Sequence, residues 1–553
     1  MKKNFLILLI LIFASYVSAI ANINDNCTIE IASDVLLVDG ANINPGDVVC
    51  LLAGEKDYLI LRDIQGTEEQ PITIVNKGGA VIIDTDHSYG IKFDNCKHII
   101  FSGDGEDGLE YGIQVKRVEN EYDGAGMSID NMSTNIEVEF IEISNTSIAG
   151  IYAKTEPYQG DCDNLITRDV FTMYNLSIHD CYLHDIADEG LYIGSSKYTG
   201  QTISQCNNIV VLPHVIEGVQ IYNNTIERTG WDGIQVSSSP VNCNIFENLI
   251  RFDSEEEEYG QMSGILIGGG AKCDCYNNKI FDGKGDGIDV LGLGFMKIFN
   301  NLIVRAGRTY KPNEPDKFKH GIYVGEIVNS ANATFKLYNN TIVSPKSSGV
   351  KYVNADASMG YIINNIVTDP GELLNNGNLS YFNIGVSPEK VSISNNFTVP
   401  TNSMVRFVNY DDNNFDLQAN SEAVNYGTSL TNEGITFDIE NRFRPFHTYF
   451  DAGAYECNDP NAAIIENNDI VGFPYPIPAS NYLNIPINPN LKQDIQVMLL
   501  SITGQIVLKT NYSKKQIFNN EISIDLAGIN SGEYIISISS SNSELTRPVI
   551  IIK

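Results

Sequence analysis

Hydrophobic and polar positions repeat with a short period between Ile141 and Val367. A polar residue followed two places later by an aliphatic one alternates along the chain with a Gly-aliphatic pair. The first pattern recurs at Asn224–Ile226, Asn248–Ile250, Asn278–Ile280, Asn301–Ile303, Asn340–Ile342 and Asn365–Val367, and the pairs begin at Gly150, Gly190, Gly233, Gly264, Gly287, Gly321 and Gly349. From Ile141, Cys181, Asn224, Asn278 and Asn340 the next pair begins nine residues later. This constant offset predicts a repeating structural unit.

Each unit is short, about 23 residues from Asn278 to Asn301, and must stack on its neighbours to bury an apolar face. The first and third residues after each Gly are mostly aliphatic, whereas the second and fourth vary, which indicates a strand with one face inward and one outward. The pattern predicts an all-β solenoid of parallel strands around one core. The Asn positions are then expected to form a hydrogen-bonded ladder at a turn.

These repeats resemble the right-handed parallel β-helix of the pectin-lyase-like fold over residues 22–457. Residues 44–83, with Asn44-Pro-Gly-Asp47 and Gln70-Pro-Ile-Thr-Ile74, are similar to the opening coils of secreted β-helix proteins, including polysaccharide lyases of the chondroitinase B and alginate lyase type. The segment Asp451-Ala-Gly-Ala-Tyr-Glu456 is similar to a closing coil. Residues 104–130 interrupt the pattern with glycine and acidic residues and are interpreted as a loop.

The N-terminus has the pattern of a secretory signal peptide, residues 1–21. Lys2 and Lys3 precede the apolar run from Phe5 to Phe13, and small residues lie at Ala19 and Ala21. No later apolar run is long enough to cross a bilayer, so we expect no transmembrane segment in the mature chain.

A second domain is predicted at the C-terminus, residues 473–553, after a polar linker at 458–472. Period-2 runs divided by Gly and Asn turns indicate a small antiparallel β-sandwich. It resembles the type A C-terminal sorting domain of the type IX secretion system of Bacteroidota, with Ile477 replacing the Asn of the family's Tyr-Pro-Asn-Pro start. The resemblance implies transit through the periplasm and across the outer membrane, with the type IX secretion machinery as partner, and release or attachment at the cell surface.

Charge and cysteine content narrow the function classes. A net charge of −33 argues against a nucleic-acid partner, because phosphate neutralisation needs basic residues. Ten cysteines in an exported chain can form disulfides, and Cys27 with Cys50 and Cys162 with Cys206 are the expected pairs. Cys243 and Cys273 occupy the same position in successive units. No cysteine pair has the spacing of a zinc site.

Two long insertions indicate where a ligand binds. The interval from Asn248 to Gly264 is sixteen residues and that from Asn301 to Gly321 is twenty, while the unit between them stays short. With coils about 4.8 Å apart, the two loops form walls roughly 10 Å apart, which suits a sugar chain. The candidate catalytic residues are Asp232, Asp286, Asp289, Arg305 and His320. The candidate substrate-binding residues are Arg228, Trp231, Gln235, Lys284, Arg308, Tyr323 and Tyr192. The second insertion also contains Lys311, Lys317 and Lys319, which with Arg305 and Arg308 make it the basic wall.

Three functions fit these residues, and an extracellular polysaccharide is the partner in each. A polysaccharide lyase would use the basic wall with His320 and Tyr323 for proton transfer, and Asp286 with Asp289 to hold calcium, the one cofactor considered. An inverting glycoside hydrolase of the polygalacturonase type would use two carboxyl groups about 6.5–9.5 Å apart, drawn from Asp232, Asp286 and Asp289. The family's Asn-Thr-Asp-Gly and Gly-His-Gly signatures are absent from the sequence.

The third function is glycan binding without chemistry, as in an adhesin, because the same fold hosts both kinds of protein. Trp231, the only Trp in the chain, is a candidate sugar platform. A separate group of His and Asp residues at His179, Asp180, His184 and Asp185 has the composition of a general base pair or a metal site.

Overall fold

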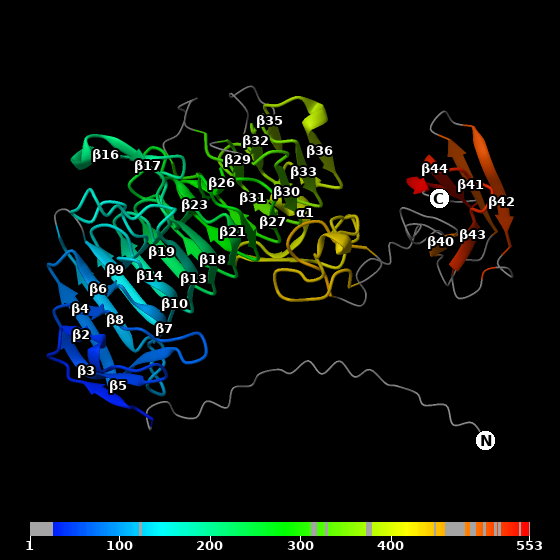
Figure 1. Ribbon diagram of the computed structural model, residues 1–553. Coiled ribbons are helices and arrows are strands. Elements are labelled where there is room, and N and C mark those ends of the chain that lie inside the picture. Colours follow the sequence, from blue (N-terminus) through cyan, green and yellow to red (C-terminus); the bar gives the residue numbers. More distant parts are fainter. Residues whose placement is uncertain are drawn as a thin grey trace, which may run out of the picture. The chain divides into compact units, whose positions relative to one another are not determined.

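The computed structural model describes residues 26–120, 124–310, 318–326, 330–371, 379–446, 449–458, 482–486, 494–501, 505–513, 517, 521–540 and 544–551. The predicted signal peptide, most of the linker, Pro474–Asn481, Lys311 and Lys317 therefore lie outside the described residues. The chain forms two compact units: residues 1–195 with 200–220, and residues 196–199 with 221–553. Both units consist mainly of β-strands (Figure 1).

The first unit is built from parallel strands that recur coil after coil. One sheet contains β1 (Ile29–Ile31), β3 (Val48–Lys56), β5 (Ile72–Thr85), β7 (Lys97–Ser102), β8 (Ile113–Val118), β10 (Thr134–Glu139), β11 (Ile141–Thr146), β13 (Thr172–His179) and β14 (Tyr182–Ile186). The other contains β2 (Leu37–Asp39), β4 (Leu59–Arg62), β6 (Tyr89–Asp94), β9 (Ala125–Asp130), β12 (Ile151–Ala153) and β15 (Leu191–Ile193). The hairpin of β16 (Gln201–Ile203) and β17 (Ile209–Val211) is antiparallel, and β18 (Val215–Tyr222) runs to the end of the unit.

Residues 104–130 are not the continuous loop that the sequence led us to expect. They contain β8 and β9, which pair in parallel with β5 and β6. The inward side chains, among them Ile113, Met127 and Ile129, are fully buried. Glycine and acidic residues fill the turns between these strands, which hid the apolar alternation.

The second unit continues the same design with three strands in each coil. One sheet contains β19 (Thr225–Thr229), β21 (Val241–Phe246), β22 (Leu249–Arg251), β24 (Cys273–Tyr276), β25 (Lys279–Phe281), β27 (Met296–Phe299), β28 (Leu302–Val304), β30 (Thr334–Tyr338), β31 (Thr341–Val343), β33 (Met359–Ile363), β34 (Ile366–Thr368), β36 (Val391–Ser394) and β37 (Phe397–Val399). The other contains β20 (Ile234–Val236), β23 (Ser263–Ile267), β26 (Asp286–Val290), β29 (Ile322–Val324), β32 (Val350–Tyr352) and β35 (Phe382–Ile384). The predicted fold class, a parallel β-helix, is confirmed.

In the second unit, the glycine of each Gly-aliphatic pair packs against an isoleucine or a valine of the other sheet. A Cβ on Gly287 would lie 2.4 Å from Ile303 Cγ2 and 2.5 Å from the carbonyl oxygen of Gly321. Gly264 and Gly321 meet Ile280 and Ile342 in the same way. Any larger residue would overlap the opposite sheet, so glycine recurs at this position from Gly233 to Gly349, and Tyr381 occupies it in the next coil.

The predicted asparagine ladder is confirmed in the second unit. The backbone N and the Nδ2 of Asn278 both donate to Oδ1 of Asn301, at 3.0 Å each, and Nδ2 also donates to the carbonyl of Ile245. The same arrangement links Asn224, Asn248, Asn278, Asn301, Asn340, Asn365 and Asn396 in order. Each buried amide in this turn therefore has hydrogen-bond partners, which removes most of the free-energy cost of burying a polar group.

The coils, predicted up to Cys457, end earlier. Among the described residues, β37 is the last strand with a parallel partner. Residues 400–457 form a cap with α1 (Asn402–Val405) and the antiparallel pair β38 (Phe407–Asn409) and β39 (Asn414–Leu417). In this cap Phe407 and Phe415 share one apolar cluster with Val304, Val343 and Ile366. The cap thus covers the outward side of β28, β31 and β34.

The C-terminal residues form an antiparallel domain with its own core. β40 (Tyr482–Pro486) pairs with β43 (Glu521–Asp525), and β41 (Ile495–Ser501), β42 (Ile506–Tyr512), β44 (Gly532–Ser539) and β45 (Glu544–Ile551) form a second sheet. Leu483, Val497, Ile524 and Ile538 lie in its core. This agrees with the predicted β-sandwich. In the described part of the chain, every helix is too short to span a bilayer.

Cysteine pairing in the structure includes both expected disulfides. Cys27 is joined to Cys50, and Cys162 to Cys206. Cys243 and Cys273, which face each other in the register of β21 and β24, form a third. The side chains at these positions therefore link neighbouring turns of the chain within each unit.

Candidate functional site

An outward column of side chains runs along one sheet of the second unit. Strand register places Gln235 beside Leu266, Leu266 beside Asp289, Asp289 beside Tyr323, and Tyr323 beside Lys351. Gln235 and Leu266 are buried, whereas Asp289, Tyr323 and Lys351 are partly exposed. The accessible part of the column therefore consists of an acid, a phenol and an amine on β26, β29 and β32.

Three further carboxyl groups lie close to Asp289 and are buried. Oδ1 of Asp232 accepts a hydrogen bond from Ser263 Oγ at 2.7 Å, and Oδ1 of Asp253 accepts one from Ser254 Oγ at 2.7 Å. Asp286 accepts from the backbone N of His320 and pairs with Lys319, with 3.0 Å between Oδ2 and Nζ. Lys319 is thus held between Asp286 and the carbonyl of Met262.

The pKa of Asp289 lies well above its usual range. Burial of the carboxyl group is the largest cause, the charge of Asp286 adds to it, and Lys319 opposes it. In the described structure Oδ1 of Asp289 is buried without a hydrogen-bond partner. Burial also raises the pKa of Asp253 to about 6. Crowded carboxyl groups cannot all carry charge, so Asp289 holds a proton where an ordinary aspartate would not.

His320 is a neutral imidazole in this group. Burial lowers its pKa to about 4, and its Nδ1 accepts a hydrogen bond from the backbone N of Ser348 at 3.2 Å. An accepting Nδ1 places the proton of the neutral ring on Nε2. The ring stacks against Tyr323 with 6.3 Å between centroids, and Lys351 Nζ lies 5.5 Å from the Tyr323 ring. The arrangement offers a carboxyl proton, a neutral imidazole and two ammonium groups.

The structure brings Asp232, Asp286, Asp289, His320 and Tyr323 together, with Gln235 in the same column, and their catalytic and binding roles stay predictions. The remaining basic candidates are engaged elsewhere. Arg305 makes a bidentate pair with Asp282 and reaches Asn413, and Arg308 pairs with Asp369 at 2.8 Å. Lys284 pairs with Glu255 and Glu257, and Arg228 with Glu227. The carboxylates in these pairs all lie outside the Asp289 group.

Trp231 is partly buried, and its carbonyl accepts hydrogen bonds from Thr229 Oγ1 and from the backbone N of Ser254. These bonds fix the turn that leads into Asp232 and hold the segment beside Asp253. Trp231 therefore lies at the edge of the carboxylate group, and its role as a sugar platform stays a prediction.

Calcium at Asp286 and Asp289 also stays a prediction. Within the described residues, these two carboxylates do not join a third carboxylate, His or Cys to give ligand atoms all within 4.8 Å of one another. The oxygen atoms of Asp286 are already occupied by Lys319 and the His320 backbone.

Tyr192 belongs to the first unit, where it forms a different cluster. It lies beside Tyr152 in the register of β12 and β15, with 5.4 Å between ring centroids. Lys154 Nζ lies 4.6 Å from the centre of the Tyr192 ring and 2.7 Å from Oε1 of Glu156. Gln201 donates to the other oxygen of Glu156. Tyr192 thus packs against Lys154, a lysine that is already paired with Glu156.

Lys351 was missed by the sequence analysis, although a signal was present. It occupies the second position after Gly349, as Gln235, Asp289 and Tyr323 do after their own glycines. Tyr259, which is 94% exposed and contributes to the electrostatic environment of Tyr323, was also missed. Tyr259 lies in an insertion without periodicity, so only the folded chain reveals its position.

Comparison with known proteins yields two family matches. Residues 209–398 match the model of the right handed beta helix region, and residues 474–553 match the secretion system C-terminal sorting domain. None of the curated protein sequences compared with this chain matches it.

Several solved structures are similar to the chain at low identity. Pectate lyase Pel9A is 16% identical, with 76% of this chain and 90% of that chain covered and a TM-score of 0.38. The A-module of the mannuronan C-5 epimerase AlgE6 of Azotobacter vinelandii is 14% identical, with 64% and 91% covered and a TM-score of 0.34. Alginate lyase from Paenibacillus sp. str. FPU-7 is 12% identical, with 65% and 100% covered and a TM-score of 0.25.

The strand pairing and the first family match define a right-handed parallel β-helix protein. Its C-terminal residues are a sorting domain of the type IX secretion system, so the chain is exported to the cell surface or the extracellular space.

Proposed function

We propose that this exported protein binds an extracellular polysaccharide on the outward column of β26, β29 and β32 and cleaves it with Asp289 as proton donor. The observation that carries the proposal is the position of Asp289. It lies on the outward face of β26 beside Tyr323, three buried carboxyl groups surround it, and its own burial and the charge of Asp286 raise its pKa. Breaking a glycosidic bond requires a proton for the leaving oxygen, by elimination or by hydrolysis.

The side chains around Asp289 suit a sugar chain. Tyr323 and Tyr259 offer ring faces for the C–H side of a pyranose, and Lys351 offers an ammonium group to a hydroxyl or a uronate carboxylate. Three coils span roughly 10 Å between the first and the third. The column therefore presents an acid, an apolar surface and a cation in a line, as an extended ligand needs.

The two kinds of cleavage differ in the second group that they require. Elimination from a uronate needs a base at C5. Nδ1 of His320 is the basic nitrogen of the neutral ring, and it would have to exchange its hydrogen bond from Ser348 for that proton. Hydrolysis needs a second carboxylate to activate water, a role for which Asp232 and Asp286 are the nearest residues. The products, an unsaturated uronate or a saturated reducing end, distinguish the two.

The test incubates the full chain with pectin, alginate, chondroitin and neutral glycans, and measures ultraviolet absorbance of unsaturated uronate, reducing ends and retention in glycan-containing gels. We expect one polysaccharide to be bound and cleaved, and Asp289→Asn to slow cleavage about 10²–10⁴-fold with binding retained. Asp274→Asn, which makes the same change on the outward face of the other sheet, is the matched control. Binding without cleavage would leave a glycan-binding protein, and neither binding nor cleavage would overturn the proposal.

A further inference from the structure

A second group of polar side chains lies in the first unit, on the outward face of β10 and β13. Glu137 and Glu139 are two residues apart on β10, so their side chains project to the same side of the sheet. Their neighbours Ile136 and Val138 point into the core. Strand register places His179, the last residue of β13, directly beside Glu139.

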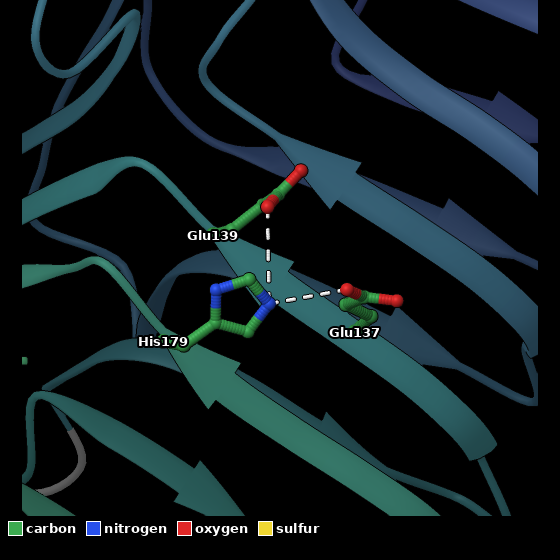
Figure 2. A group of neighbouring side chains, drawn as sticks. All are labelled: Glu137, Glu139 and His179. Carbon is green, nitrogen blue, oxygen red and sulfur yellow. Dashed lines mark hydrogen bonds and ion pairs between the residues drawn. The ribbon is translucent and has the colours of Figure 1, made fainter. Parts of the chain in front are cut away.

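Both glutamates approach the same nitrogen of His179. Nε2 is 3.1 Å from Oε1 of Glu137 and 3.8 Å from Oε2 of Glu139, and one ligand atom from each of the three residues lies within 4.8 Å of the others. Figure 2 shows the two carboxylates converging on that nitrogen from different directions. The other ring nitrogen, Nδ1, is 2.7 Å from Oδ2 of Asp180.

These separations match those between ligands of a small divalent metal ion. With metal–ligand bonds of about 2.0–2.2 Å, tetrahedral coordination places ligand atoms about 3.3 Å apart. The two measured separations from Nε2 lie on either side of that value. A carboxylate on the far nitrogen of the ligating histidine, as Asp180 provides, orients the ring toward a metal and strengthens it as a ligand.

The local charge also favours a cation. Glu137, Glu139 and Asp180 surround one imidazole, and Asp104 adds to the negative potential at Glu139. The site thus attracts positive charge at Nε2, where a proton and a metal ion compete.

We propose that Glu137, Glu139 and His179 bind a divalent transition-metal ion of the Zn²⁺ type, with Asp180 as a positioning residue. A nitrogen ligand with two carboxylates suits Zn²⁺ better than Ca²⁺ or Mg²⁺, which prefer oxygen ligands alone. Three protein ligands leave a coordination position for water. Because the ligands come from successive coils, the metal joins β10 to β13.

The chain contains a matched control in His184, which has most of the same surroundings. Its Nδ1 is 2.6 Å from Asp185 and its Nε2 is 3.3 Å from Oε1 of Glu142. Glu142, however, is also bound by Lys116, whose Nζ lies 2.8 Å from Oε1. His184 thus has one nearby glutamate, which also pairs with a lysine, where His179 has two. We therefore do not expect His184 to bind a metal ion.

The experiment uses the full chain after treatment with a chelator. Calorimetric titration with Zn²⁺ should show one tight site per chain, and Co²⁺ should give the intense visible absorption of tetrahedral coordination. We expect His179→Ala to abolish both signals, and Glu137→Gln and Glu139→Gln each to weaken binding by at least about tenfold. Asp180→Asn should weaken binding by about 10 to 100-fold. His184→Ala should retain both signals.

Circular dichroism and thermal melting establish that each variant is folded. If His179→Ala does not fold, the two glutamine variants, which keep the side-chain volume, decide the outcome. Equal Zn²⁺ affinity in the wild type and in the glutamine variants would overturn the proposal. Equal loss of binding in His184→Ala and His179→Ala would do so as well, because it would indicate general attraction to an acidic surface.

Discussion

Two sets of buried polar side chains in the second unit differ in how their hydrogen bonds are satisfied. In the asparagine ladder, Asn278 donates from N and Nδ2 to Asn301, and Asn301 does the same to Asn340. In the Asp289 group, four carboxyl groups share one buried lysine. The ladder is neutral and complete, whereas the carboxyl groups carry more potential charge than their partners balance.

The difference separates polar residues that maintain the fold from those that do chemistry. A satisfied amide column stabilises each turn and has no reactive group. Carboxyl groups that crowd one another cost stability and acquire unusual proton affinities, which is a recurring property of active sites. The unequal satisfaction of buried groups therefore supports the function proposed for the Asp289 group.

The largest effect on stability is expected when the one balanced charge of the Asp289 group is disturbed. Asp286→Ala removes the carboxylate that pairs with Lys319 and accepts from the His320 backbone N, in a site where the Asp286 and Lys319 side chains are largely buried, and it leaves Lys319 only the longer-range charge of Asp289 and Asp232. We expect a loss of about 3–5 kcal/mol in the free energy of unfolding. Urea unfolding followed through Trp231 fluorescence measures it. In the control, Asp274→Ala removes the more exposed pair with Lys297 and should cost less than about 1 kcal/mol. Equal losses in the two variants would contradict this.

The ladder should be nearly as sensitive, for a different reason. Asn301→Ala removes the acceptor of two buried donors on Asn278 and one of the two donors to Asn340, Nδ2, while the backbone N of residue 301 stays. We expect a loss of about 3 kcal/mol, since each orphaned buried group costs about 1–3 kcal/mol. The same fluorescence assay measures it, and Asn420→Ala at an exposed position should change little. A ladder variant as stable as that control would show that the column is dispensable.

The Asp253 carboxyl group should make the free energy of unfolding depend on pH, which the neutral asparagine ladder does not. Its pKa rises on folding from 3.8 to about 6, so the folded state binds more protons between those values. The contribution of this group to the free energy of unfolding is therefore largest below pH 4. It decreases as the pH rises from about 4 through about 6, by about 2–3 kcal/mol in total. Asp253→Asn should remove that part of the decline in melting temperature between pH 4 and pH 7. An unchanged pH profile in the variant would contradict the assignment.

The smallest effect is expected at Arg305. Its guanidinium pairs with Asp282 where both side chains are partly exposed, so Arg305→Ala should cost less than about 1 kcal/mol of stability. Because its contacts lie with Asp282 and Asn413, polysaccharide cleavage should stay within twofold of the wild type. Initial rates on the polysaccharide that the wild type cleaves test this. A large loss of activity would return Arg305 to the catalytic group.

The repeated features were predictable because each repeat contacts its copy. Asn278 and Asn301 are partners of the same kind, and Gly287 faces an isoleucine as Gly264 and Gly321 do. Periodicity along the chain is then a direct record of contact between coils. The outward column that contains Asp289 and Tyr323 follows from the same register.

The ion pairs were not predictable, because their partners come from loops and from the cap. Arg305 reaches Asn413, 108 residues away, and Arg308 reaches Asp369 from a turn. The spacing of residues along the chain does not predict such contacts. The basic residues that the sequence predicted as one wall therefore form separate ion pairs in the structure. Likewise, the metal site proposed at Glu137 and Glu139 forms only because the register of β10 and β13 brings His179 beside them.

The ladder also determines how the molecule can change. Successive asparagines are separated by as few as 23 residues, between Asn278 and Asn301, and by as many as 39, between Asn301 and Asn340, with the same bonds at each step. The hydrogen bonds of the ladder thus form whatever the number of residues between two successive asparagines. Segments can be inserted, lost or duplicated between these fixed points while the stack persists, so one exported framework can acquire new ligands by altering its loops alone.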